Sequence, residues 1–166
     1  MTLTLPWFKF NNQLGVGLYG VSMAVNTFGI FIGYAILSVI EIKKEKKFFV
    51  FIMSGILISC TMIIYSMTLN FYLIAVLFFI DGLCLAAMGS LLQTSIQSCV
   101  PPNMRSKVFA FRNTLYTALM PIGMMIAGML GEKIQMNIII FADYAVFLML
   151  FIYLSFLSSV KKIINI

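Results

Sequence analysis

The stretch that decides the fold runs from Phe48 to Met104 and reads FFVFIMSGILISCTMIIYSMTLNFYLIAVLFFIDGLCLAAMGSLLQTSIQSCVPPNM. Asp81 is its only charged residue. A helix crosses a bilayer with about 20 mostly apolar residues, so this stretch is long enough for two spans. The apolar run pauses at residues 68–70, where Asn tolerates a turn, and we expect spans at about 48–68 and 71–97.

A charged segment precedes this stretch, and a pair of prolines near its end marks the end of its second helix. Glu41-Ile-Lys-Lys-Glu-Lys-Lys47 precedes it, and Pro101-Pro102 stops its second helix because Pro supplies no N–H and disfavours helix in the residue before it. Further apolar runs predict spans at about 16–40, 113–130 and 137–160. We therefore expect an extracytoplasmic segment at 1–13, a five-helix membrane domain at 14–160 and a cytoplasmic tail at 161–166.

The composition supports an all-α integral membrane protein. Of the 166 residues, 62% are hydrophobic and 10% are charged, and the mean hydropathy is +1.07. Soluble domains are about 45–50% apolar and about 25% charged, so the composition excludes a water-soluble globular protein, and its high apolar content excludes a disordered one. The net charge of +6 does not indicate nucleic-acid binding, because the cations are divided among short clusters between apolar runs.

Lysine and arginine set the expected orientation, because cytoplasmic loops carry an excess of both. With five spans, one side of the membrane holds only Lys9 and Lys133. The other side holds Lys43, Lys44, Lys46, Lys47, Arg105, Lys107, Arg112, Lys161 and Lys162. We expect a multi-pass protein of the cell membrane, surrounded by the lipid bilayer, with its N-terminus outside and its C-terminus in the cytoplasm.

The sequence offers no enzymatic motif. There is no His, and the three cysteines Cys60, Cys84 and Cys99 lie in or at the end of apolar stretches without CxxC spacing. GxSxG, HExxH and phosphate-binding glycine loops are also absent. We expect no catalytic activity, no cofactor and no metal site. The first apolar run, Phe10–Ile40, is too long for the core of a cleavable signal peptide.

Four polar side chains inside the spans are candidates for a transport path. Asp81 is about the eleventh residue of its helix and lies roughly 15 Å deep by helical rise. A carboxyl at that depth needs a water-filled cavity or a polar partner. It serves either as a hydrogen-bond partner for another helix, or in proton coupling or the binding of a cationic substrate. Asn26 and Gln93 are weaker candidates of the same kind, and Asp143 lies nearer the interface, where solvation also accounts for it.

Small residues predict where helices pack closely, since membrane helices associate through close approach of their backbones. The first span carries Gly29 and Gly33 in a GxxxG pattern, and the third carries Gly82 at the start of a small face. In the fourth span, a small face follows Pro121. That face holds Gly123, Ala127 and Gly128.

The segment from Gln97 to Phe109 reads QSCVPPNMRSKVF and resembles the cytoplasmic loop before the penultimate helix of major facilitator superfamily exporters. The resemblance is narrower to the macrolide-efflux-like branch and rests on Gln97, Pro101, Arg105 and Lys107. The next helix repeats it in LMPIGMMIAG, residues 119–128, where the family has Pro-x-Gly and then small residues. This chain has Ser106-Lys107 where the family usually has Gly-Arg.

Major facilitator transporters have two six-helix halves, and the resemblance covers about helices eight to twelve. It implies a carboxy-terminal fragment of a proton-driven exporter for a small hydrophobic, macrolide-like molecule. The resemblance also implies that the small faces of the first and fourth spans pack against the missing amino-terminal half, or that the chain associates with itself. The alternative is a degenerate remnant that binds other membrane helices without transporting.

Overall fold

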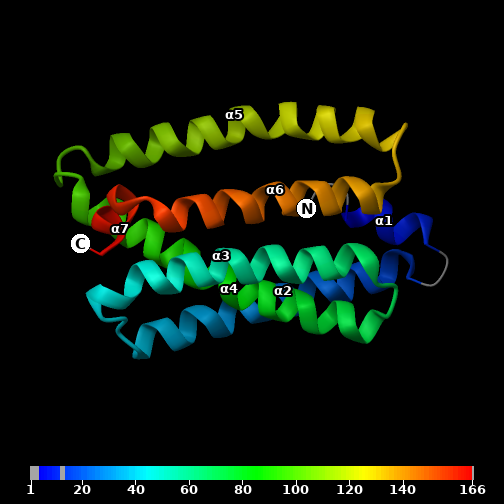
Figure 1. Cartoon of the computed structure of the whole chain (residues 1–166), viewed down its shortest axis with the longest axis horizontal. Helices are drawn as coiled ribbons and strands as arrows, with labels where there is room; N and C mark the ends of the chain where they lie inside the picture. Colours follow the sequence, from blue (N-terminus) through cyan, green and yellow to red (C-terminus); the bar gives the residue numbers. More distant parts are fainter. Residues whose placement is uncertain (1–3, 12–13, 166) are drawn as a thin grey trace.

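The computed structural model describes residues 4–11 and 14–165, and every regular element in that part of the chain is a helix. The helices α2 to α6 are long and apolar enough to cross a membrane, whereas α1 and α7 are short (Figure 1). Their bounds are α1 (Thr4–Phe10), α2 (Gly15–Val39), α3 (Lys44–Met67), α4 (Phe71–Cys99), α5 (Arg105–Gly131), α6 (Met136–Phe156) and α7 (Ser158–Ile164).

The turn between α3 and α4 lies where the pause in the apolar run predicts it. Asn70 is the N-cap of α4, and its side-chain oxygen accepts the backbone N–H of Tyr72 at 3.0 Å and that of Leu73 at 3.5 Å. These two bonds satisfy amides that have no partner within the helix. A short polar cap is therefore enough to separate two long apolar helices.

Two helix boundaries differ from the expected spans. α5 begins at Arg105, earlier than the expected position 113. The expected span left out the first turns because they are too charged for the bilayer, but these turns are helical all the same. The segment expected to run from 137 to 160 is interrupted at Leu157, whose backbone is extended. The interruption lets Val160 and Ile164 of α7 turn back and pack against the bundle.

α2 and α4 cross with their backbones almost in contact. A Cβ atom on Gly29 would lie 2.5 Å from the carbonyl oxygen of Phe79, and one on Gly33 would lie 2.6 Å from the Cβ of Ala86. Gly82 faces the backbone of Asn26 with no room for a side chain. The expectation that this face of the first span packs against a second half is wrong, because α4 of the same chain covers it.

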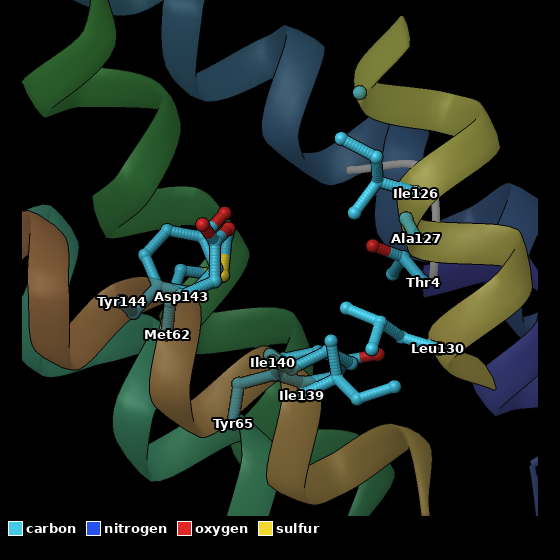
Figure 2. Close-up of a pocket in the computed structure, with 11 residues that line it drawn as sticks. Thr4, Met62, Tyr65, Ile126, Ala127, Leu130, Ile139, Ile140, Asp143 and Tyr144 are labelled. Atoms are coloured by element: carbon cyan, nitrogen blue, oxygen red, sulfur yellow. The ribbon is translucent and has the colours of Figure 1, made fainter. Parts of the chain in front are cut away.

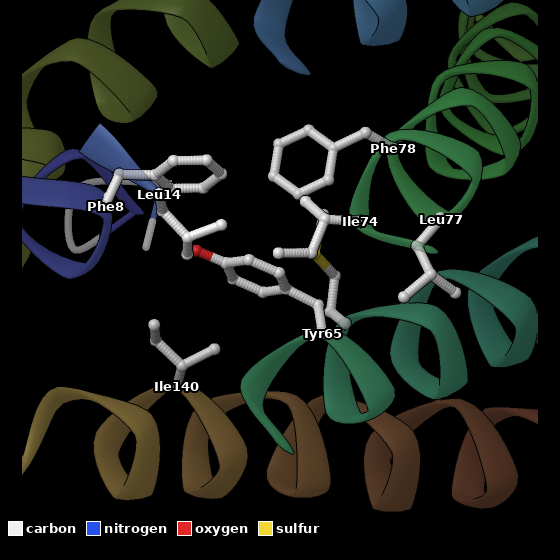
Figure 3. Close-up of a cluster of buried hydrophobic side chains, with 8 residues drawn as sticks. Phe8, Leu14, Tyr65, Ile74, Leu77, Phe78 and Ile140 are labelled. Atoms are coloured by element: carbon white, nitrogen blue, oxygen red, sulfur yellow. The ribbon is translucent and has the colours of Figure 1, made fainter. Parts of the chain in front are cut away.

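The core has two parts along α3, which packs against both α4 and α6. One cluster surrounds Tyr65, whose ring meets that of Phe78 edge-on with the ring centroids 5.3 Å apart (Figure 3). α1 closes this cluster, since Phe8 is fully buried in it. The second cluster, at the other end of α3, consists of Phe51, Ile52, Leu91, Phe151 and Ile164.

α5 stands apart from this bundle. It lies beside α6 in Figure 1, and its one substantial contact within the described chain is with that helix. None of its residues is buried, whereas half of the most apolar window of α3 is. The five long helices thus divide into a packed group, α2, α3, α4 and α6, and one helix that has little to pack against.

Candidate functional site

Asp81 and Asn26 form a buried polar pair between α4 and α2. Asp81 is 1% exposed and Asn26 is 5% exposed. The side-chain amide nitrogen of Asn26 donates to Oδ2 of Asp81 at 2.9 Å and to the backbone carbonyl of Phe78, also at 2.9 Å. The hydrogen bond required by the packing interpretation of Asp81 is therefore present, and its partner is a neutral amide. A role of Asp81 in proton coupling stays a prediction.

The other two candidates for the transport path lie elsewhere. Gln93 is exposed and lies more than three turns along α4 from Asp81. Asp143 is exposed on α6, on the side that faces α5. The structure therefore joins Asn26 to Asp81 by a hydrogen bond, and neither Gln93 nor Asp143 takes part in that bond.

Asp143 lines a cavity of about 360 Å³ between α5 and the α3–α6 pair (Figure 2). Most of its wall is apolar, with Thr4 of α1 and Tyr144 of α6 as further polar residues. The lining residues are Thr4, Met62, Tyr65, Gly123, Ile126, Ala127, Leu130, Ile139, Ile140, Asp143 and Tyr144. The cavity thus carries an acidic group, Asp143. The hydropathy of α6 alone does not show that this residue borders a cavity.

Tyr65 is a residue that the sequence did not single out. Its side chain is 1% exposed and borders the cavity, yet its hydroxyl has no hydrogen-bond partner among the residues that the structure describes. Two further buried atoms, the indole nitrogen of Trp7 and the side-chain oxygen of Asn137, have no hydrogen-bond partner within residues 4–11 and 14–165. Both residues line a second cavity of about 480 Å³ near the start of α6. In an apolar run, Tyr65 resembles any other aromatic residue, so only its three-dimensional surroundings reveal it.

Two small residues of α5, Gly123 and Ala127, line the cavity beside Asp143. A Cβ atom on Gly123 or Gly128 would meet nothing within 4 Å, and Ala127 borders the cavity. Pro121, in the interior of α5, is exposed as well. Gly29 and Gly33 of α2 are covered by α4, whereas Gly123 and Gly128 of α5 face open space in the described part of the chain.

One of the four residues of the loop motif between α4 and α5 makes a side-chain hydrogen bond within that loop. Nε of Arg105, the first residue of α5, donates to the backbone carbonyl of Val100, the C-cap of α4, at 3.1 Å. Gln97, Pro101 and Lys107 are exposed. Within residues 4–11 and 14–165, no three His, Cys, Asp or Glu side chains are placed to hold a metal ion.

Comparison with known proteins gives one match. The family model of the Major Facilitator Superfamily matches residues 1–163. Neither curated proteins nor solved structures give a match to this chain. The family model covers nearly the whole sequence and agrees with five apolar helices of membrane-spanning length. The chain therefore belongs to the major facilitator superfamily, a family of multi-pass membrane transporters.

Proposed function

We propose that this chain is the carboxy-terminal part of a proton-driven exporter of small hydrophobic, macrolide-like molecules, and that it works together with a separate amino-terminal half. The observation that carries the proposal is the open face of α5. A transporter of this family moves substrate between two halves, so a polypeptide that needs further helices for function should expose a helix-packing surface.

The open face has the chemistry of a helix interface rather than of a lipid surface. Gly123 and Ala127 allow the close backbone approach that membrane helices use to associate. Polar side-chain atoms without partners are costly in hydrocarbon, and the Tyr65 hydroxyl is such an atom. A helix that lies in the gap and offers polar side chains to Tyr65 and Asp143 would satisfy both.

The Asn26–Asp81 pair supports the proton-driven part of the proposal. Asp81 is held by a neutral amide, so nothing in this pair requires the carboxyl to stay ionised. A carboxyl that is neutral in a dry site and ionised in a wet one transfers a proton when the site alternates between the two. The macrolide-like substrate rests on the loop motif at Gln97, Pro101, Arg105 and Lys107.

The proposed setting is the cell membrane, with the N-terminus outside. The loops at one end of the bundle, which join α2 to α3 and α4 to α5, lie together with α7 (Figure 1). That end holds most of the lysines and arginines, as expected of the cytoplasmic side.

An efflux assay tests the proposal. The chain is expressed alone, and also with the amino-terminal half of a major facilitator exporter, in cells that lack other macrolide pumps. We expect export of radiolabelled erythromycin only with both parts, abolished by a protonophore. If the chain reaches the membrane with its partner and no efflux above background follows for erythromycin or for ethidium, the alternative holds: a membrane protein that binds other helices without transporting.

A further inference from the structure

The short helix α7 folds back onto the bundle and brings two distant parts of the chain together. Val160 and Ile164 pack in the cluster around Phe51 and Phe151, and Ile164 is only 4% exposed. The side-chain oxygen of Asn165 accepts the backbone N–H of Phe48 at 2.9 Å. The end of the chain is therefore attached to the first turns of α3.

This attachment gathers lysines that the sequence keeps far apart. The helix α7 lies at the end of the bundle where α3 begins (Figure 1), and it carries Lys161 and Lys162. Ile42 and Phe48 pack in the same cluster as α7, so the segment between them shares this surface. We call it the basic surface, and its cations are Lys43, Lys44, Lys46, Lys47, Lys161 and Lys162. Glu41 and Glu45 are the acidic residues of that segment.

The start of α3 adds to the positive potential of the basic surface. Lys43 is the N-cap of α3, and its side chain makes no capping hydrogen bond. The N-terminus of a helix carries partial positive charge and free backbone N–H groups, so anions stabilise it and cations do not. Lys44, Lys46 and Lys47 lie in its first turns, where an external anion would offset their repulsion.

Exposed apolar side chains next to these lysines point to a lipid rather than a dissolved anion. Val39 and Ile40, at the end of α2, are 84% and 59% exposed, and Phe49 is 65% exposed. An anionic phospholipid presents a phosphate above its acyl chains, so it can contact lysines and apolar side chains together. A dissolved phosphate can contact only the lysines.

We propose that the basic surface binds the phosphate headgroups of anionic phospholipids, phosphatidylglycerol being the probe. This binding holds α7 against α3, and it does not depend on whether the chain transports anything. The positive-inside pattern requires only that these lysines lie on one side of the membrane. A lipid site requires in addition that α7 and the start of α3 act together, and the test addresses that requirement.

Native mass spectrometry of the purified full chain, titrated with phosphatidylglycerol or phosphatidylcholine of the same acyl chains, measures the binding. We expect phosphatidylglycerol to bind about tenfold more tightly. Lys161→Gln/Lys162→Gln should remove most of this preference, whereas Lys161→Arg/Lys162→Arg, which keeps both positive charges, should retain it. Lys9→Gln/Lys133→Gln changes the net charge equally at the opposite end of the bundle and should leave the preference intact.

Two further measurements test whether α7 contributes to the site and whether a dissolved phosphate ester can replace the lipid. Asn165→Ala loosens α7 without changing any charge, and we expect it to weaken phosphatidylglycerol binding while helix content by circular dichroism stays the same. Glycerophosphate at the same concentration and ionic strength should not displace the lipid. Equal affinity for the two lipids, equal loss in the control at the opposite end, no effect of Asn165→Ala, or displacement by glycerophosphate would each overturn the proposal.

Discussion

The side-chain amide of Asn26 lies 2.9 Å from the carboxylate of Asp81, and this hydrogen bond joins α2 to α4 at the place where their glycines meet. The same amide also donates to the backbone carbonyl of Phe78. Close glycine packing and a polar pair thus occur at one helix crossing. The crossing holds Asp81 in a fixed position, so substitutions there separate its structural role from its chemical one.

The first prediction concerns the proton on Asp81. Asp81→Asn keeps the shape of the side chain, and its oxygen can still accept from Asn26. We therefore expect normal insertion and abundance, together with loss of proton-driven efflux when the chain is assembled with an amino-terminal half. Efflux measured from mildly acidic to mildly alkaline pH checks this, with Glu132→Gln, which neutralises an exposed carboxyl just after α5, as the control. If the Asp81→Asn protein exports as well as the parent throughout, Asp81 is a packing residue only.

The second prediction concerns the energy of the pair itself. Asn26→Leu removes the donor and leaves a buried carboxyl without its partner, so we expect a loss of about 1 kcal/mol in the free energy of unfolding in detergent. Asp81→Leu in the same chain should recover part of that loss, because two apolar side chains need no partner. A double-mutant cycle measures the coupling, and strictly additive effects would show that the bond contributes nothing to stability.

Glycines offer a third prediction with a control inside the same chain. Gly33→Leu places a side chain where Ala86 already lies, so we expect a loss of about 1–3 kcal/mol as α2 and α4 move apart. Gly123→Leu places the same side chain where nothing lies within 4 Å, so the isolated chain should tolerate it. Thermal unfolding in detergent compares the two variants, and equal destabilisation would contradict the packing described here.

Hydropathy and charge predicted the helices of this chain well, because length, apolar runs and lysine clusters are local properties. The turn at residues 68–70 follows from a pause in the apolar run and an Asn that can cap a helix. The break at Leu157 did not follow, because both sides of it are apolar and the reason for it lies in the cluster that Ile164 joins.

Partners were harder to predict than positions. The depth of Asp81 identified it as a residue that needs a partner, but the sequence did not say that Asn26 is opposite it, since the relative register of α2 and α4 depends on glycine contacts. Small residues four positions apart occur in both helices, as Gly29 and Gly33 in α2 and as Gly123 and Ala127 in α5, and only the structure shows that the first pair is covered by another helix and the second is not. Tyr65 gave no signal, because its unpaired hydroxyl is a property of its surroundings.

The orientation of the chain is open to a direct measurement, the fourth prediction. In a background without the native cysteines, Lys44→Cys should react with a membrane-impermeant maleimide only from the cytoplasmic side, and Lys133→Cys only from outside. The two residues follow α2 and α5 and therefore lie at opposite ends of the bundle. The helices α3, α4 and α5 separate the two sites, so an odd number of spans places them on opposite sides of the membrane. Reaction of both cysteines from the same side of intact cells would contradict this arrangement.

The fifth prediction tests the open face of α5. Expressed alone, the chain should be short-lived or oligomeric in detergent, because within the described part of the chain α5 has no buried residue and the Tyr65 hydroxyl has no hydrogen-bond partner. Co-expression with the amino-terminal half should raise its abundance several-fold.

Two tryptophan variants test whether the gap is the binding surface. Ala127→Trp fills the gap, so it should abolish the rise in abundance while leaving the isolated chain unchanged. Met125→Trp lies at a position that is 62% exposed and does not line the cavity, so it should permit the rise. Quantitative immunoblotting and light scattering measure both effects. If Ala127→Trp and Met125→Trp respond alike, or if the isolated chain is a stable monomer, the gap beside α5 is a lipid-facing surface and not the seat of another helix.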